Sequence, residues 1–458
     1  MRTKRTYDVI GAAGVVLTLL LLAGCESHEP ATGKTTPPVG APVSPRVSTI
    51  DPCAVALAPH EGVDHADRQI IHLQQEARRA AEPIAHLERL GWAFIAKARR
   101  SFDPGFYTLA EQCALCIATH QPLSAEALLL HGHVLHNLHR FREGEVLARQ
   151  LVAQRGLSFD YGLLGDVLVE QGKLAEAVEA YQHMTDQKPG PQAYSRVAYI
   201  RWLKGDLAGA IEVMRMAAGV SGFHDAEAAA WAHVRLALYE LQADRLPQAS
   251  DHLAAALAMQ PDYAPALLAR GRLLLAQDNP TPAIAPLARA AQLNPLPEYQ
   301  WVLIEVLRAT GRADEADAVA TQLRQRGAAN DRRTFALYLV TTGQDCETAL
   351  RLAEEELTTR ADVFTLDTLA WALSAVGRYQ EARTFSERAL AEGTQDARLF
   401  YHAGVIAAAV GQPDEAAHWF AQAATLRQML LPSERQHLAT ASAALSSQLS
   451  SLASRPLP

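Results

Sequence analysis

The sequence predicts an all-α solenoid built from repeated pairs of helices. A six-residue phrase that begins with glycine and ends with alanine recurs along the 458-residue chain, and neighbouring copies stand 33 or 34 residues apart in two places. That spacing is typical of one helix-turn-helix unit. Apolar residues recur at steps of three and four, as in Leu267, Leu268, Leu274 and Leu275, which indicates helices rather than strands. The five copies of the phrase begin at Gly172, Gly205, Gly311, Gly377 and Gly411.

Each fixed position of the phrase has a physical cause. The glycine ends the first helix of a pair in a left-handed conformation that residues with a Cβ atom resist. The alanine five residues later lies where the two helices cross, so a larger side chain would push them apart. A proline closes several units, at Pro189, Pro261 and Pro295, because it lacks the N–H that a continuing helix needs.

This pattern resembles the tetratricopeptide repeat family, which has W-x2-L-G-x2-Y, then A-x3-F, then P over 34 residues. The clearest copy carries apolar residues in the aromatic slots and consists of Leu267, Gly271, Leu274, Ala283, Leu287, Ala290 and Pro295. The resemblance implies a right-handed α-α superhelix of about nine to ten helix-turn-helix repeats. A chain of this length then needs no division into globular domains.

The register predicts where the units lie. The array is expected to span residues 67–430, with an irregular pair of helices before residue 125, an insertion at residues 219–225 and the least regular unit near residue 329. The nine regular units are predicted to start near residues 125, 158, 191, 230, 264, 297, 329, 363 and 397. Residues 431–458 are expected to form a capping helix and tail, with Ser433 as N-cap and Gln436 completing a capping box. The side chains expected to face the array are Leu438, Leu445, Leu449 and Leu452.

The N-terminus has the features of a secretion signal. Basic residues precede an apolar stretch at residues 9–22 that is short for a membrane span. It ends in Leu22-Ala23-Gly24-Cys25, which resembles the bacterial lipobox, in which the cysteine is acylated and residues 1–24 are removed. An ordinary signal peptide with a chance cysteine is the alternative. In that family an aspartate after the cysteine retains the lipoprotein on the inner membrane, so Glu26 favours the outer membrane, with the chain facing the periplasm.

Residues 25–66 are predicted to be the acylated cysteine and a flexible tether. Seven prolines lie between Pro30 and Pro59, and the stretch has little apolar content to bury. Such a chain reaches on the order of 35 Å from its anchor. Removal of residues 1–24 leaves a net charge near −10, which argues against nucleic acid and against electrostatic adhesion to anionic lipid.

The sequence carries no motif that predicts catalysis. It has no nucleophile elbow, phosphate loop, dinucleotide fingerprint or metalloprotease helix. We therefore expect a protein that is not an enzyme and that needs no cofactor.

One cluster of cysteines and histidines leaves several interpretations open. Cys113, Cys116 and His120 are followed on the next predicted helix by His131, His133, His136 and His139. These side chains suit a borderline metal such as zinc or copper. Alternatively, Cys53 pairs with Cys113 or Cys116 in an oxidising compartment, or the cysteines are packing residues.

The register also predicts a binding groove. In the family, positions 2, 5, 9, 12 and 13 of each unit point into the concave face. The aromatic residues at those positions are Trp92, Tyr199, Trp202, Trp231, Trp301, Phe364, Trp371 and Tyr401. Nearby polar contacts are expected from Arg272, Glu305, Arg308, Arg333 and Asp367. The alternative is that the aromatics pack between neighbouring first helices.

These observations predict a membrane-anchored adaptor. Its aromatic groove is expected to bind a protein or peptide partner of the cell envelope, because tryptophan and tyrosine concentrate at binding hot spots. A periplasmic metal-binding protein and a carbohydrate-binding scaffold of an export system are the other hypotheses. The sequence does not determine the partner or the oligomeric state.

Overall fold

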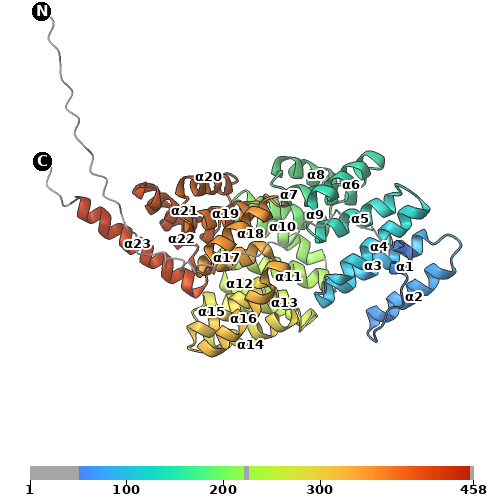
Figure 1. Cartoon of the computed structure of the whole chain (residues 1–458), viewed down its shortest axis with the longest axis horizontal. Coiled ribbons are helices and arrows are strands. Elements are labelled where there is room, and N and C mark those ends of the chain that lie inside the picture. The colour runs from blue at the N-terminus through green and yellow to red at the C-terminus, as the bar shows by residue number, and fades with distance from the viewer. Residues whose placement is uncertain (1–50, 221–225, 454–458) are drawn as a thin grey trace, which may run out of the picture.

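The computed structural model describes residues 51–220 and 226–453, and within these ranges every regular element is a helix. Consecutive helices pack against one another along the whole chain and form a superhelix (Figure 1). The predicted all-α solenoid is confirmed.

Nine helix pairs follow residue 124, and an earlier pair precedes them. The earlier pair is α3 (Ile84–Ser101) and α4 (Gly105–His120). The nine are α5 (Ala125–Asn137) and α6 (Phe141–Gln154), α7 (Ser158–Glu170) and α8 (Leu174–Gln187), α9 (Pro191–Leu203) and α10 (Leu207–Val220), α11 (Ala226–Gln242) and α12 (Leu246–Met259), α13 (Ala264–Ala276) and α14 (Pro280–Leu293), α15 (Pro297–Ala309) and α16 (Ala313–Asn330), α17 (Arg332–Thr341) and α18 (Cys346–Leu357), α19 (Val363–Ala375) and α20 (Tyr379–Leu390), and α21 (Ala397–Ala409) and α22 (Pro413–Thr425).

Seven of the nine units begin at the predicted residue, and two do not. Helix α11 begins four residues early, at Ala226, because the alanine-rich start of this helix favours helical backbone. Helix α17 begins three residues late, at Arg332, because α16 continues for 18 residues. Asp331 then caps α17 by accepting a hydrogen bond from the Thr334 N–H at 3.1 Å.

The recurring phrase behaves as predicted. Its five glycines have φ between 71° and 80°, in the left-handed region. The alanine five residues later is fully buried in all five copies, as at Ala177 and Ala210. The glycine therefore ends one helix, and the alanine allows the next helix to cross it closely.

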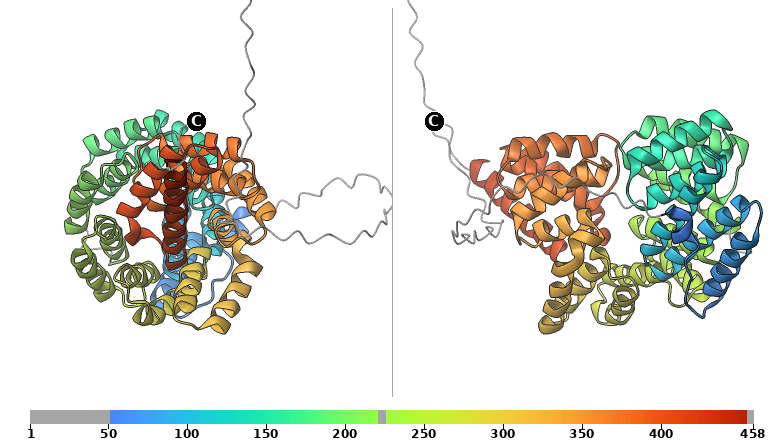
Figure 2. Two further views of the ribbon diagram at one scale, coloured as in Figure 1. Left: turned by 90° about the vertical axis from the view of Figure 1, so that its left-hand side faces the viewer. Right: turned by 45° about the vertical axis from the view of Figure 1, so that its right-hand side comes forward.

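The superhelix closes on itself after about one turn, along a contact that we call the seam. The seam joins the turns that follow α7, α9 and α11 to residues 358–362 and 391–396, which precede α19 and α21. The Ala361 N–H donates to the Glu170 carbonyl at 3.0 Å, and the Thr394 hydroxyl donates to the Leu203 carbonyl at 2.6 Å. Figure 2 shows the resulting ring of helices in its left-hand view.

Ion pairs and apolar side chains complete the seam. Arg360 pairs with Glu170 at 2.7 Å, and Lys204 pairs with Glu392. On the inner side of the seam, buried apolar residues of both turns belong to one cluster, which contains Leu163, Leu164, Leu203, Val363 and Leu399. The seam is therefore continuous with the core of the repeats.

Two glycines of the recurring phrase lie at the seam. A Cβ atom on Gly172 would lie 2.4 Å from the Ala361 carbonyl oxygen, and one on Gly205 would lie 2.5 Å from the Gly393 carbonyl oxygen. At Gly311, Gly377 and Gly411 the same atom would meet nothing within 4 Å. Only the first two glycines are therefore required both by the turn and by the closure of the superhelix.

The C-terminal helix α23 (Pro432–Ala453) follows the short 3-10 helix η2 (Arg427–Met429) and lies across the ring (Figure 2). The predicted cap at Ser433 is wrong, because the helix begins one residue earlier and Glu434 accepts the Leu431 N–H at 2.8 Å. The Ser433 hydroxyl instead donates to Glu305 on α15 at 2.9 Å.

Burial along α23 agrees with the prediction as far as the side chains are described. Leu438 and Leu445 are buried, as expected of residues that face the array. The side chains of Leu449 and Leu452 lie outside the described residues.

Part of the predicted tether is folded. Helix α1 (Pro52–Ala56) and helix α2 (His65–Arg79) precede the first pair, and Ala56 is fully buried against the same core as α3 and α4. The expectation of a tether to residue 66 is therefore wrong for residues 51–66. Cys25 and residues 26–50 lie outside the described residues. No described helix combines the length and apolar character needed to cross a bilayer.

We expect alanine at Gly172 or Gly205 to cost more stability than alanine at Gly311. At all three sites the left-handed backbone costs about 1–2 kcal/mol, and at the seam the clash with a carbonyl oxygen adds about 1–3 kcal/mol. Urea unfolding of the Gly172→Ala, Gly205→Ala and Gly311→Ala variants measures the difference. Equal losses at all three sites would show that the seam contributes nothing.

Candidate functional site

Three of the predicted groove aromatics are core residues. Trp301, Trp371 and Tyr401 are 2%, 5% and 7% exposed. The Trp371 ring stacks on the His402 ring at 4.2 Å, and its indole N–H donates to the Thr341 hydroxyl at 3.2 Å. These side chains pack between neighbouring first helices, which is the alternative that the sequence left open.

Another group of groove aromatics lies at the seam. The Trp202 ring of α9 stacks on Phe364 of α19 at 5.7 Å and on Tyr199 at 5.7 Å. The Trp202 indole N–H donates to the Gln242 side chain at 2.7 Å. These rings are half-buried and stack on one another where the two turns of the superhelix meet.

The remaining predicted groove residues have separate surroundings. Trp92 packs on His133 at 5.2 Å, whereas Trp231 is 40% exposed on α11. Arg308 pairs with Asp317 of α16 at 3.4 Å and does not line the hollow described below. Glu305 is buried, and it accepts from both the N–H and the hydroxyl of Ser433. It therefore holds α23 in place instead of facing a ligand.

Five of the predicted residues meet around one space, which we call the inner hollow. It has a volume of about 190 Å³ and is lined by residues of the first helices α13, α15, α17, α19 and α21 and of the N-cap of α21. Its charged lining residues are Arg272, Glu298, Arg333, Asp367, Asp396 and Arg398. Its apolar lining residues are Trp301, Leu337, Phe364 and Leu399. Pockets for drug-sized ligands span about 300–1,000 Å³, so the inner hollow suits one side chain or chain end.

Each arginine of the inner hollow already has a carboxylate partner. Arg272 donates to Glu298 at 2.9 Å, and this pair is partly open to solvent, with side chains 23% and 47% exposed. The other two pairs are Arg333 with Asp362 at 2.7 Å and Arg398 with Glu434 at 2.7 Å.

The carboxylate partners of Arg333 and Arg398 are Asp362 and Glu434. Burial favours the protonated form of Glu434, but Arg398 outweighs this and lowers its pKa. The pKa of Asp362 is likewise lowered, because Arg333, Arg360 and the hydrogen bonds from Thr365 together outweigh the effect of burial. Both pairs are therefore ionised at neutral pH.

Two carboxylates of the inner hollow have no such partner among the described residues. Asp396 caps α21 and accepts the N–H groups of Arg398 at 2.8 Å and Leu399 at 3.2 Å. Its pKa is raised above the ordinary 3.8 by burial, and the neighbouring Asp367 acts in the same direction. Asp367 accepts only from His402, at 3.0 Å. The sequence analysis missed Asp396, although an aspartate just before a predicted helix is a signal for a cap.

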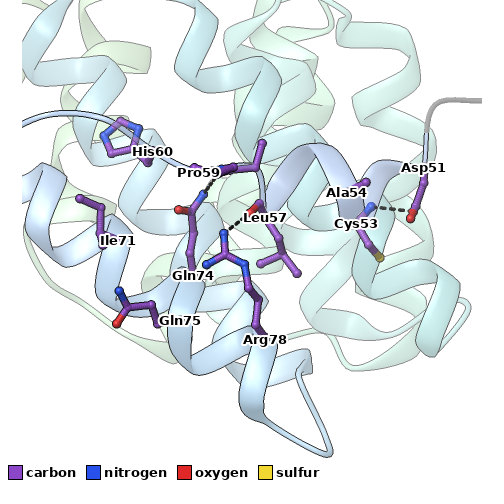
Figure 3. Close-up of a pocket in the computed structure, with 11 residues that line it drawn as sticks. Asp51, Cys53, Ala54, Leu57, Pro59, His60, Ile71, Gln74, Gln75 and Arg78 are labelled. Atoms are coloured by element: carbon purple, nitrogen blue, oxygen red, sulfur yellow. Dashed lines mark hydrogen bonds between the residues drawn. The ribbon is translucent and has the colours of Figure 1, made fainter.

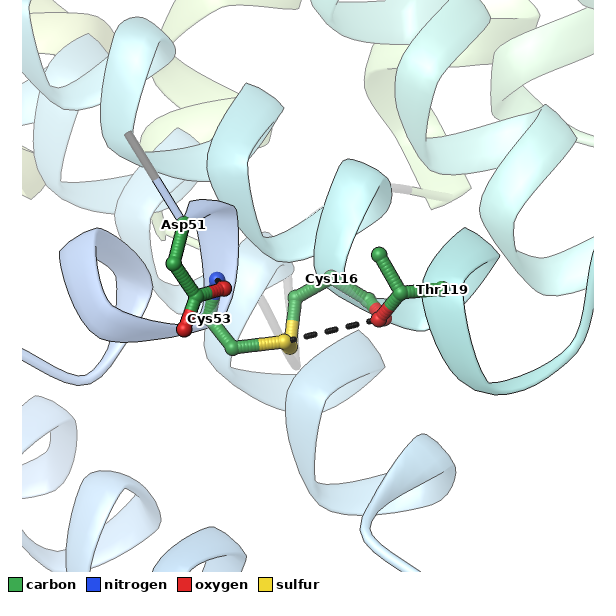
Figure 4. Close-up of a disulfide and its surroundings, with 4 residues drawn as sticks. All are labelled: Asp51, Cys53, Cys116 and Thr119. Atoms are coloured by element: carbon green, nitrogen blue, oxygen red, sulfur yellow. Dashed lines mark hydrogen bonds between the residues drawn. A yellow bond between two sulfur atoms is a disulfide. The ribbon is translucent and has the colours of Figure 1, made fainter. Parts of the chain in front are cut away.

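The structure joins Cys53 of α1 to Cys116 of α4 in a disulfide (Figure 4). This is one of the two pairings that the sequence left open, and it links α1 to the first helix pair across 63 residues. Cys113 is buried and carries a free thiol, and burial raises its pKa.

The structure does not assemble the predicted metal ligands. His120 lies near the Cys53 and Cys116 sulfurs, but both sulfurs are in the disulfide. His131 contacts Glu111 at 3.2 Å, and the burial of His133 lowers its pKa to about 4. His136 and His139 both pack on the Phe141 ring.

A second space of about 680 Å³ lies between α1 and α2 (Figure 3). Leu57 and Ile71 give it an apolar wall beside Cys53. Gln74 spans its floor by donating to the carbonyl groups of Ala56 at 3.1 Å and Ala58 at 2.7 Å. These bonds hold the segment after α1 against α2.

Comparison with known proteins agrees with the repeat register. A family model described as a tetratricopeptide repeat matches residues 163–230 and 234–296. The described helices therefore form a solenoid that contains tetratricopeptide repeats. No curated protein matches the chain.

Solved structures with related architecture include the following three. Yeast Tom70 has a TM-score of 0.36 and 14% identity, over 84% of this chain and 97% of that chain. YrrB, a TPR protein with an unusual peptide-binding site, has a TM-score of 0.29 and 13% identity, over 40% of this chain and 92% of that chain. The Cut9–Hcn1 hetero-tetramer of APC/C has a TM-score of 0.33 and 11% identity, over 85% of this chain and 98% of that chain.

We expect Asp396→Asn to stabilise the protein at pH 7. Asparagine caps a helix about as well as aspartate, so the change removes a costly buried charge and keeps the cap. Because the folded-state pKa is raised, the cost is present at neutral pH and is relieved as Asp396 protonates, so the gain should vanish below about pH 4.

Denaturant unfolding between about pH 3 and about pH 8 measures this dependence. Asp345→Asn is the matched control, because Asp345 also caps a helix but is exposed, so the change removes no buried charge. A variant at Asp396 that is less stable than the natural chain at pH 7 would contradict the expectation.

Proposed function

We propose that this chain is a lipid-anchored scaffold of the bacterial cell envelope that binds a protein or peptide partner. The observation that carries the proposal is the array of tetratricopeptide repeats, because solenoids use their extended concave surfaces for binding. The structure contains no recognised constellation of catalytic side chains among its described residues.

The disulfide supports an envelope location. Disulfides persist in oxidising compartments such as the periplasm and are rare in the cytosol. The first cysteine of this bond, Cys53, lies C-terminal to the lipobox-like sequence that ends at Cys25. A chain acylated at Cys25 would hold the array at a membrane through residues 26–50, and Glu26 favours the outer membrane facing the periplasm.

The binding centre that the geometry favours is the inner hollow and its rim. Part of the aromatic groove predicted from the sequence is used in packing, because Trp301, Trp371 and Tyr401 are buried and Trp202 stacks on Phe364 across the seam. The Arg272–Glu298 pair remains partly exposed at the hollow.

We expect Cys25→Ser to move the protein from the membrane fraction to the soluble fraction, because the acyl chains supply the stable attachment. Glu26→Asp is the companion variant, and it should shift the protein from the outer to the inner membrane. Fractionation of envelopes measures both changes. Membrane attachment of the Cys25→Ser protein at the natural level would refute the lipid anchor.

We expect the double variant Arg272→Gln, Glu298→Gln to reduce cross-linking of the full-length chain to its partner by about tenfold, because bonds to charged groups contribute about 1.5–3 kcal/mol. The matched control is Arg312→Gln, Glu315→Gln, which removes an ion pair of 2.6 Å on α16 away from the hollow. The measurement is the yield of specific cross-linked species in envelopes. Equal yields for both double variants would exclude the hollow as the binding centre.

A further inference from the structure

Three arginines and three carboxylates line the inner hollow, but two of the arginines are bonded to Asp362 and Glu434, which lie outside the lining. Its three arginines are each bonded to one carboxylate, and Asp367 and Asp396 are left over. Among the described residues, the Asp367 side chain accepts a hydrogen bond from His402, and the Asp396 side chain accepts from backbone N–H groups. An anionic ligand would have to compete with Glu298, Asp362 and Glu434 for the guanidinium groups. A cationic ligand finds two carboxylates that share the influence of Arg398, whose guanidinium is already bonded to Glu434.

The position of Asp396 has an energetic cost that capping does not explain. Burial raises the pKa of Asp396, and the nearby carboxylate of Asp367 acts in the same direction; together they exceed the opposing effects of Arg398 and of the capping N–H groups. Asparagine would cap α21 equally well without a charge. A charged group that lowers stability inside a hollow indicates a ligand that compensates the charge.

The walls of the inner hollow suit a long side chain. Trp301, Phe364, Leu337 and Leu399 supply apolar contact for a methylene stem. The Arg272 Nε–H is buried and has no acceptor, so it is available to a carbonyl group of a bound peptide. The volume of about 190 Å³ is small for a cofactor.

We propose that the inner hollow binds a cationic side chain of a partner peptide, lysine or arginine, whose charged end lies between Asp367 and Asp396. The methylene stem lies along Trp301 and Phe364, and a peptide carbonyl accepts from Arg272. The inference rests on the proposed function, because it takes the partner to be a peptide. It adds the chemistry by which that peptide is recognised.

Small probes test the recognition directly on the full-length chain in detergent. N-acetyl-lysine N-methylamide carries the side-chain ammonium, N-acetyl-norleucine N-methylamide is its neutral counterpart, and glycine N-methylamide carries only an α-ammonium. Isothermal calorimetry is expected to show binding of the lysine probe, with a dissociation constant on the order of 1 mM, about −4 kcal/mol. The norleucine probe should bind at least about tenfold more weakly.

The variants separate recognition from folding. Asp396→Asn, which keeps the helix cap, and Asp367→Asn, which keeps an acceptor for His402, are each expected to weaken the lysine probe about tenfold. Asp345→Asn, at an exposed cap, is expected to leave binding unchanged. Undiminished binding to the Asp396→Asn protein, or equal binding of the norleucine probe, would overturn the inference. Binding of glycine N-methylamide in place of the lysine probe would also overturn it, in favour of a chain terminus.

This experiment and the cross-linking experiment fail independently. If the Arg272 and Glu298 variants reduce cross-linking but the lysine probe does not bind, the scaffold proposal stands and only the lysine recognition falls. If the lysine probe binds as expected but cross-linking does not depend on Arg272 and Glu298, the hollow recognises a cation without being the centre of a protein interface.

Discussion

The seam is the contact on which the rest of the structure depends. The repeats stack with a curvature that brings the turns after α7 and α9 against the segments before α19 and α21. There the Ala361 N–H donates to the Glu170 carbonyl, and the Thr394 hydroxyl donates to the Leu203 carbonyl. Backbone approaches this closely only where no Cβ atom intervenes, as at Gly172 and Gly205. Because the apolar side of the seam is continuous with the core, opening it would expose Val363 and Leu399 to water. The ring is therefore part of the folded core.

Closure changes what the concave face offers a partner. An open superhelix would present the aromatic rings of successive first helices as one surface. Here Trp202 and Phe364 stack on each other, and the Trp371 ring stacks on His402. The helix α23 further covers the ring at the C-terminal end, where Ser433 binds Glu305. The inner hollow combines six charged side chains with the rings of Trp301 and Phe364.

The sequence predicted several of the residues that line the hollow, but few of the contacts between them. The register placed Arg272, Arg333 and Asp367 on the inner face, and all three line the hollow. It could not show that Glu305 holds a C-terminal helix, or that Asp396 lies beside Asp367, because these contacts join residues far apart in the sequence. The two displaced helix starts have local causes. Helix α11 begins early because its first residues are rich in alanine, and α17 begins late because α16 continues to Asn330.

The sequence by itself determined the repeating unit, since left-handed turns at glycine and close helix crossings at alanine are local requirements that five or six residues can encode. Residues 1–25 also predict a secreted, tethered chain, and a bond from Cys53 to Cys113 or Cys116 was one of the interpretations that the sequence left open for its cysteines. Tertiary structure alone decided that Cys53 joins Cys116, that the superhelix closes and that the predicted groove becomes a small charged hollow. Small rotations between successive repeats add up over six units, and no local pattern specifies their sum.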